Sequence, residues 1–153
     1  MGQQQLLLLV LGIVIVGIAV VAGIQAFSEG KDKAEQDAAI SDAMRIISDT
    51  QAWMLKPAAF GGGSGAVTPN DKVTFAALGY KVTAGQAYAT VNGCFELTGD
   101  GAESAKLVIY RLNDDTPETP GGVPSCGGAK IADVQITGAT TEGISWTYAT
   151  EES

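Results

Sequence analysis

The 153-residue chain contains no histidine, and this excludes His-based catalytic triads, His zinc sites and c-type haem attachment. It has only nine basic residues against 17 acidic ones, for a formal net charge of −8. Such a balance does not provide the basic surface typical of nucleic-acid-binding proteins, so no nucleic-acid partner is expected. At this length we expect one domain of ordinary size, not two with full cores.

The sequence also lacks the motifs that carry most enzyme chemistry. It has no P-loop, no G-x-G-x-x-G after a strand, no nucleophile elbow and no C-x-x-C pair. Two acidic segments, 100–103 and Asn113–Glu118, carry oxygens that hard cations bind, but their spacing is not that of an EF-hand. Solvated loops explain both segments better than a Ca²⁺ site. We therefore expect no catalytic residue, no metal and no cofactor, and we interpret the chain as not an enzyme.

Charged side chains are absent from residues 1–28, and the rest of the chain carries all of them. Within this part, Leu6–Ile24 is an unbroken run of 19 residues made only of Leu, Val, Ile, Ala and three glycines. As a helix the run is about 28 Å long, enough to span the hydrocarbon of a bilayer. The alternative is a cleaved secretory signal. Such signals begin with basic residues, and Met1–Gln5 contains none.

The orientation of this span conflicts with the charges that follow it. The first bases, Lys31 and Lys33, come after the span, so the positive-inside rule would leave the C-terminal part in the cytoplasm. A basic leader that preceded Met1 and was then removed would resolve the conflict. The state of Cys94 and Cys126 depends on the answer, because they would pair in an exported domain and stay reduced in the cytoplasm.

From Glu29 to about Leu55 the sequence remains helical but becomes amphipathic. Apolar residues recur there at helical spacing, which predicts a stripe that packs on the rest of the chain: Ile40, Met44, Ile47 and Met54, with Gln51 in line and Ala43 and Thr50 beside it. No proline occurs before Pro57, so the simplest interpretation is one helix of about 50 residues. Lys56-Pro57 ends it, because the residue before proline avoids the α region.

Strand signals dominate from Lys72 onward. Alternating apolar and polar residues predict strands at 86–97, 106–112, 130–137 and 141–149, with 73–82 as a shorter strand or an irregular crossing. Short turns between the segments favour antiparallel neighbours. A sheet with one apolar face needs a cover, and the apolar stripe of the helix is the obvious candidate. The predicted fold class is α+β, a long N-terminal helix packed on a C-terminal antiparallel β-sheet head.

The chain is accordingly divided into four parts. Residues 1–28 form an apolar transmembrane half-helix, and residues 29–56 form an amphipathic half-helix. Residues 57–71 form a Gly-rich loop, which is a flexible hinge or, as we prefer, a sharp connection from helix to sheet. Residues 72–153 form the antiparallel head, with a loop that a Cys94–Cys126 bridge would close.

The order of these parts resembles the type IV pilins and the related pseudopilins, with their lollipop architecture. The likeness covers the whole chain in architecture and rests on sequence in Met1–Met54. In that family a prepilin peptidase removes a short basic leader after a glycine, and the new N-terminal residue becomes N-methylated. The resemblance implies that Met1 is the mature N-terminus, and it supplies the basic leader that the orientation requires.

Two positions depart from the family pattern. Most members have a glutamate at the fifth mature position, where it meets the N-terminal amine of a neighbouring subunit, whereas this chain has Gln5. Glutamine still accepts a hydrogen bond from an ammonium, and a neutral group costs less to bury than an unpaired carboxylate. The helix-kinking proline usual near position 22 is also absent, and Ala22 stands there.

The resemblance implies a structural subunit, a major pilin, of an extracellular filament for adhesion, motility or surface attachment. Identical subunits would wait in the inner membrane, and an assembly ATPase would drive their extrusion into a homo-oligomeric helical filament. Bundling of the N-terminal helices would use residues of the apolar half: Leu6, Leu9, Gly12, Val16, Gly17, Val20 and Gly23. Export also predicts that Cys94 and Cys126 are joined.

Two other functions are compatible with the sequence. The first is a membrane-anchored monomeric β-domain that binds a ligand or an envelope partner. The second is a type II secretion pseudopilin. The continuous helix distinguishes the filament subunit from a simple anchor, because an anchor has no need for an apolar span that runs without a break into an amphipathic helix.

Overall fold

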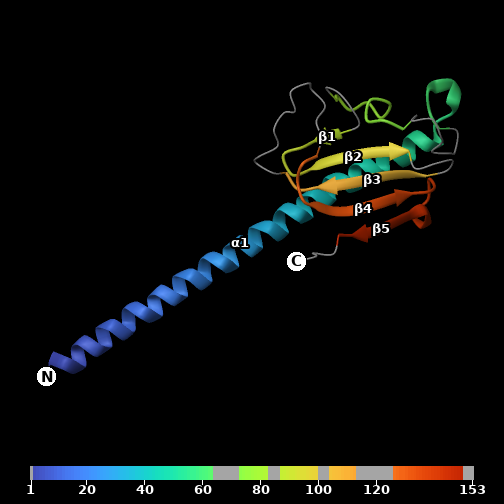
Figure 1. Cartoon of the computed structure of the whole chain (residues 1–153). Helices are drawn as coiled ribbons and strands as arrows, with labels where there is room; N and C mark the ends of the chain where they lie inside the picture. The colour runs from blue at the N-terminus through green and yellow to red at the C-terminus, as the bar shows by residue number, and fades with distance from the viewer. Residues whose placement is uncertain (1, 64–72, 83–86, 100–103, 113–125, 150–153) are drawn as a thin grey trace. The chain divides into compact units, whose positions relative to one another are not determined.

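The computed structural model describes residues 2–63, 73–82, 87–99, 104–112 and 126–149. Helix α1 (Gly2–Leu55) is followed by an antiparallel sheet, so the expected α+β class is confirmed (Figure 1). Contacts divide the chain into two compact units, Met1–Ala34 and Glu35–Ser153. The first unit is therefore helix alone, and the second holds the rest of α1 with the sheet.

The first unit buries nothing of itself. Residues 2–31 of α1 are all exposed. The helix contains a stretch long and apolar enough to cross a membrane, with a mean hydropathy of 3.1 and no buried residue. Absence of proline lets the backbone remain helical throughout, because every interior N–H keeps its partner four residues back.

The sheet of the second unit has five strands within the described residues, in the order β1-β2-β3-β4-β5, and each pairs antiparallel with the next. The strands are β1 (Ala87–Ala89), β2 (Cys94–Gly99), β3 (Ala105–Tyr110), β4 (Lys130–Ile136) and β5 (Ile144–Tyr148). Their register places Leu97, Leu107, Val134 and Trp146 in one row across the sheet. The predicted meander is confirmed.

The segment predicted as one strand, 86–97, is instead a hairpin. Strands β1 and β2 are separated by a turn in which the Thr90 N–H donates to the Gly93 oxygen at 2.9 Å. Asn92-Gly93 is a turn dipeptide that the alternation of apolar residues concealed. Val91, which the alternation placed inside, is 92% exposed because it lies in this turn.

Two further segments differ from their predicted form. Residues 73–82 form turns, closed by hydrogen bonds such as Tyr80 N–H to Phe75 O at 2.8 Å, which agrees with the irregular crossing and not with the strand. Gly79 adopts φ +88° there, a conformation that favours glycine. The start of the predicted 141–149 strand is the 3₁₀ turn η2 (Thr141–Gly143), so β5 begins only at Ile144.

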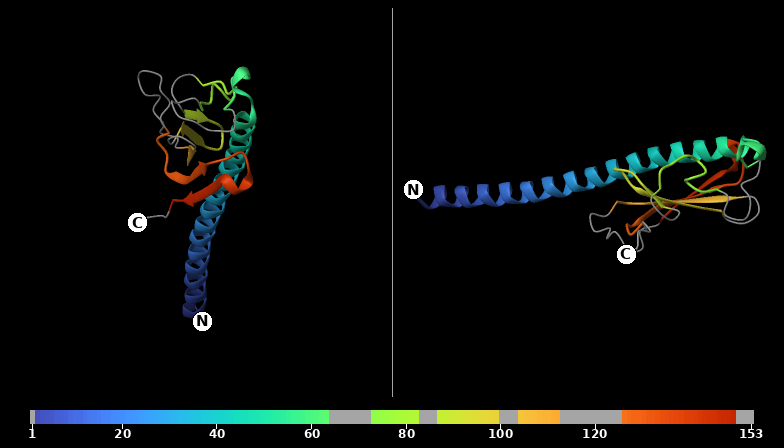
Figure 2. Two further views of the ribbon diagram at one scale, coloured as in Figure 1. Left: turned by 90° about the vertical axis from the view of Figure 1, so that its right-hand side faces the viewer. Right: turned by 90° about the horizontal axis from the view of Figure 1, so that it is seen from above.

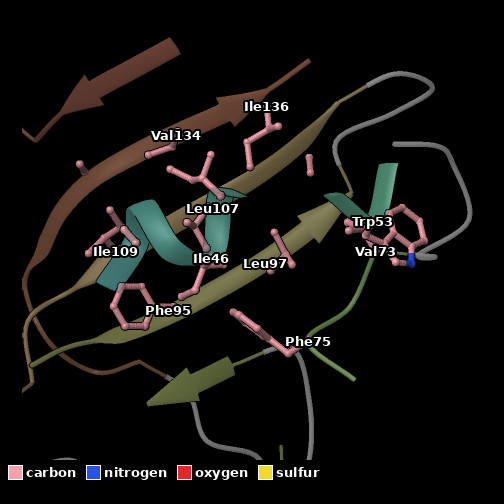
Figure 3. Packing of buried hydrophobic residues seen from close by; sticks show 14 of the residues in the cluster. Ile46, Trp53, Val73, Phe75, Phe95, Leu97, Leu107, Ile109, Val134 and Ile136 are labelled. Carbon is pink, nitrogen blue, oxygen red and sulfur yellow. The ribbon is translucent and has the colours of Figure 1, made fainter. Parts of the chain in front are cut away.

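The core of the second unit lies between α1 and one face of the sheet (Figure 2). Figure 3 shows Ile46 of α1 set among Leu97, Leu107 and Ile109 of β2 and β3, and all four are no more than 1% exposed. Phe75, from the turn segment, adds an aromatic ring to the same cluster. Each of these large side chains stabilises the fold by about 1.5–3 kcal/mol on burial.

The buried face of α1 is displaced by one position from the predicted stripe. Ile47 and Met54 are buried and Ile40 is half-buried, but Met44 is 50% exposed, so its assignment to helix–sheet packing is wrong. The residues that face the sheet are Ala39, Ala43, Ile46, Ile47, Thr50, Trp53 and Met54. Ala39 and Ala43 are fully buried in this interface, and Gly93 approaches Ala39 closely.

Helix α1 ends at Leu55, as Lys56-Pro57 predicts. The chain then makes the 3₁₀ turn η1 (Ala58–Phe60), and Gly61 adopts φ +76°. The Gly63 N–H and the Lys56 N–H both donate to the Trp53 oxygen, and the Trp53 ring N–H donates to the Gly61 oxygen at 2.9 Å. The Gly-rich segment therefore begins as a tight turn folded back on the helix end, and its residues 64–71 lie outside the described part.

Candidate functional site

The exposed apolar part of α1 is the most unusual surface of the chain. Fourteen large apolar side chains in residues 6–24 are each between 51% and 69% exposed. Burial of such a side chain is worth about 1.5–3 kcal/mol, so the set is worth tens of kcal/mol. Water alone is therefore an unfavourable environment for this helix, which is long and apolar enough to cross a membrane.

The residues predicted to form the filament core are all exposed in the single chain. At 100° per residue, most of them fall within one arc about 80° wide: Gln5, Leu9, Gly12, Val16, Val20 and Gly23. Leu6 and Gly17 lie at one side of this arc. A Cβ added at Gly12, Gly17 or Gly23 would meet no atom of the described residues within 4 Å, so no contact among those residues requires glycine at these three positions. Met1, the predicted mature N-terminus, lies outside the described residues.

A second surface continues on the part of α1 that packs on the sheet. Opposite the buried face, five exposed residues form an uncharged strip: Ser41, Met44, Ser48, Ala52 and Leu55. Met44 is 50% and Leu55 is 68% exposed, and the Ser48 hydroxyl donates to the Met44 carbonyl at 3.0 Å. Because that hydroxyl is already bonded within the helix, Ser48 can be buried without loss of a hydrogen bond.

Cys94 and Cys126 form a disulfide with a Cα–Cα distance of 5.5 Å, as predicted. The bridge attaches the chain at residue 126 to the start of β2. The Cys126 N–H donates to one oxygen of Glu96 at 3.4 Å, and the Tyr110 hydroxyl donates to the other at 3.2 Å. Burial, followed by the charge of Glu96, raises the pKa of Tyr110, so its phenol remains a donor.

A groove of about 560 Å³ opens on the flank of α1, between the helix and the turn at 77–81. The helix contributes Arg45 and Asp49 to its lining, at a spacing that places them on one side, and Lys56 follows directly after the end of α1. The turn contributes Tyr80 and Lys81, and β1 contributes Tyr88. Sequence reasoning missed this site, because its two walls are separated by more than twenty residues of chain.

The aromatic wall of the groove is held by hydrogen bonds and ring packing. The Tyr80 hydroxyl donates to Asp49, and the Tyr80 ring lies 4.8 Å from that of Tyr88 and 5.8 Å from that of Phe75. Burial, and then the hydrogen bond to the Asp49 carboxylate, raises the pKa of Tyr80 to about 12, although the Arg45 charge opposes this shift. The phenol therefore keeps its proton and its bond to Asp49 at any physiological pH.

The described residues contain no group of three or more His, Cys, Asp or Glu side chains arranged to hold a metal ion. The two acidic segments that carry oxygens suited to Ca²⁺, 100–103 and Asn113–Glu118, lie outside those residues. The described surface has three features suited to contact with other molecules: an apolar helix, an uncharged strip and a polar groove. Comparison of the chain with protein-family models, curated proteins and solved structures returns no significant match.

Proposed function

We propose that this chain is the structural subunit of an extracellular type IV pilus-like filament, held in the inner membrane before assembly. The observation that supports this best is α1 itself, one unbroken helix from Gly2 to Leu55 whose uncharged first part buries nothing in its own chain. Bundled with copies of itself, that part would leave lipid without meeting water. The heads would then form the outside of the filament.

The uncharged strip on the later part of α1 favours a filament over a simple anchor. A membrane-anchored head that works as a monomer exposes this side of the helix to water, where charged residues are the usual choice. The strip from Ser41 to Leu55 instead offers Met44 and Leu55, with small residues between them that allow close approach. A neighbouring helix is the partner that such a surface suits.

The glycines of the apolar part fit the same interpretation. Nothing inside the chain requires Gly12 or Gly23, which share one side of the helix, and each weakens a helix by about 1 kcal/mol relative to alanine. Small residues on one side of an apolar helix let two backbones approach closely in lipid. Gly12 and Gly23 would then serve contacts between copies.

The proposal assigns roles at the N-terminus by resemblance to the pilins. A prepilin peptidase would remove a basic leader and leave Met1 as an N-methylated start. Gln5 would accept a hydrogen bond from the Met1 amine of the next copy, in place of the family's usual glutamate. An assembly ATPase would supply the work of extrusion, so this subunit needs no catalytic residue and no cofactor.

The disulfide supports export of the head. Cys94 is bonded to Cys126, and disulfides persist in oxidising compartments outside the cytoplasm. With the head outside and a basic leader inside, the span would obey the positive-inside rule despite Lys31 and Lys33.

Shearing of the cell surface followed by negative-stain microscopy tests the proposal. We expect the chain to appear in thin filaments in the sheared fraction. Gly12→Ile, within the proposed contact arc, should reduce the filament yield more than Ala22→Ile, which adds bulk on another side of the same helix. A chain found only as a monomer in the membrane fraction would overturn the proposal and favour the membrane-anchored binding module.

A further inference from the structure

The basic residues of this acidic chain are concentrated at one place. Three of the nine, Arg45, Lys56 and Lys81, line the groove between α1 and the turn at 77–81, and all three are exposed. In a chain with a net charge of −8, such a concentration creates a local positive field on a molecule that repels its own copies.

The carboxylates nearest the groove offset only part of this positive charge, and each is hydrogen-bonded to neutral groups. Asp49 is the acidic residue in the lining, and it accepts the hydrogen bond from Tyr80. Asp42, two turns earlier on α1, accepts from the Thr90 hydroxyl and from the Asn92 amide, each at 2.9 Å. Asp49 and Asp42 keep their negative charges, but the three cations of the described groove lining outnumber its one carboxylate by two.

The contrast with the lysines elsewhere on the head is direct. Lys130 and Lys106 both lie near Asp133, at 2.8 Å and 3.9 Å from its oxygen. Among the described residues no salt bridge involves Arg45, Lys56 or Lys81. Three cations in one groove are therefore available to a carboxylate from outside the described part of the chain.

The groove is also preformed. The turn that carries Lys81 is closed by the Gly79 N–H to Ala76 O bond at 3.1 Å, and the packed rings of Phe75, Tyr80 and Tyr88 support it from below. A partner that enters the groove meets an aromatic wall that is already in place, which lowers the entropy lost on binding.

We propose that this groove binds a carboxylate-rich segment of a second copy of the chain. The inference rests on the proposed filament, because a filament brings many copies, each with 17 acidic residues, into contact. Contacts between like-charged subunits require local pairs of opposite charge, and the groove supplies the cationic half. Two pairs of adjacent acids in the sequence, Asp114-Asp115 and Glu151-Glu152, have the charge to supply the other half.

Carbodiimide cross-linking of filaments from the sheared surface fraction tests the inference. The reagent joins a lysine amine to a carboxylate only where the two are in contact. We expect a cross-linked dimer whose linked peptides join Lys56 or Lys81 to an aspartate or glutamate, in pairs that are absent from the monomer band. Raising the salt from about 0.1 M to about 1 M should weaken that product, because the screening length falls from about 10 Å to about 3 Å.

Lysine variants test whether the cross-linked dimer depends on the groove. The double change Lys56→Gln and Lys81→Gln should abolish this dimer and reduce filament yield about fivefold or more, as expected for the loss of partly exposed ion pairs. Lys130→Gln removes the same charge from the Asp133 pair outside the groove and should leave both unchanged.

The outcomes separate the two proposals. Filaments whose dimers are linked only through other residues, or that give no dimers, would overturn the groove contact and leave the filament standing. Absence of filaments would overturn both. A third outcome is that no dimer is linked at the groove, while the wild-type chain binds polygalacturonate and the double variant does not. This outcome would identify an acidic polysaccharide as the ligand and would also overturn the inference.

Discussion

Ala39 of α1 lies directly against Gly93 of the turn between β1 and β2. A Cβ placed on Gly93 would stand 3.1 Å from the Ala39 Cβ and 3.0 Å from the Tyr110 carbonyl oxygen. Both distances are shorter than ordinary van der Waals contacts, so glycine at 93 and alanine at 39 together set how closely the helix approaches the sheet. Ala43, one turn further along, is fully buried in the same interface.

The first prediction concerns this contact. Gly93→Ala should lower the free energy of unfolding of the head by about 1–3 kcal/mol, because neither the Ala39 Cβ nor the Tyr110 backbone can move away freely. Gly99→Ala is the matched control, since a Cβ there meets nothing within 4 Å. Denaturant unfolding of the full chain in detergent, followed by circular dichroism, measures both. Equal midpoints for the two variants would show that the close approach is relaxed in solution.

The second prediction separates the two neighbouring residues that the sequence pattern does not distinguish. Ala43→Leu should destabilise the head by about 1–3 kcal/mol through overpacking. Met44→Ser should change the head by less than about 0.5 kcal/mol, because Met44 is half exposed, but it should lower filament yield. The same unfolding assay and the shear assay measure the two effects. A large loss of head stability with Met44→Ser would mean that the predicted stripe was right after all.

The third prediction concerns pH. The pKa of Tyr80 is raised from 10.0 to about 12 in the folded head, so the folded state holds this proton more tightly than the unfolded state. The resulting stabilisation is fully present below about pH 10 and is lost as the pH rises toward about 12. Unfolding midpoints at about pH 9 and about pH 11 should therefore differ more for the wild-type chain than for Tyr80→Phe.

Tyr148→Phe provides the control for this measurement, because Tyr148 is 59% exposed. It should lose as much stability as the wild-type chain over the same pH interval. If Tyr80→Phe also loses as much, the bond from Tyr80 to Asp49 does not hold the groove wall in the way that the structure indicates.

The fourth prediction concerns Gln5. Gln5→Leu should weaken assembly while membrane insertion and head folding remain intact, because a hydrogen bond to a charged amine is worth about 1.5–3 kcal/mol where it is desolvated. Gln5→Glu should be tolerated, since it restores the family's usual ion pair. The measurement is the filament yield of each Gln5 variant in the shear assay, compared with the amount of the same chain retained in the membrane. A normal yield from Gln5→Leu would show that packing of the leucine-rich run alone carries assembly.

Local periodicity was sufficient to predict the helix and the order of the strands. The apolar run, the stop at Lys56-Pro57 and the alternation in β3 and β4 are each visible within a dozen residues, and the structure agrees with them. The Asn92-Gly93 dipeptide also indicates a turn, but the alternating apolar residues on both sides of it are equally typical of one continuous strand.

The remaining features depend on contacts between distant segments. Ala43 and Met44 belong to one apolar side of the helix, and only the distance between helix and sheet decides which of them is buried. The groove likewise requires that the turn carrying Tyr80 and Lys81 fold against Arg45 and Lys56. Sequence spacing shows that Arg45 and Asp49 share a side of α1, but it does not show what faces them.

Electron cryomicroscopy of sheared surface filaments, combined with the intact mass of their subunit, tests the central claim most directly. We predict a central bundle of helices formed by residues 2–28, with the disulfide-bonded heads outside, and a subunit mass that corresponds to a chain starting at a methylated Met1. The account would be contradicted if the filaments were built from another protein and this chain were found only in the membrane fraction, still with a leader or a formyl group.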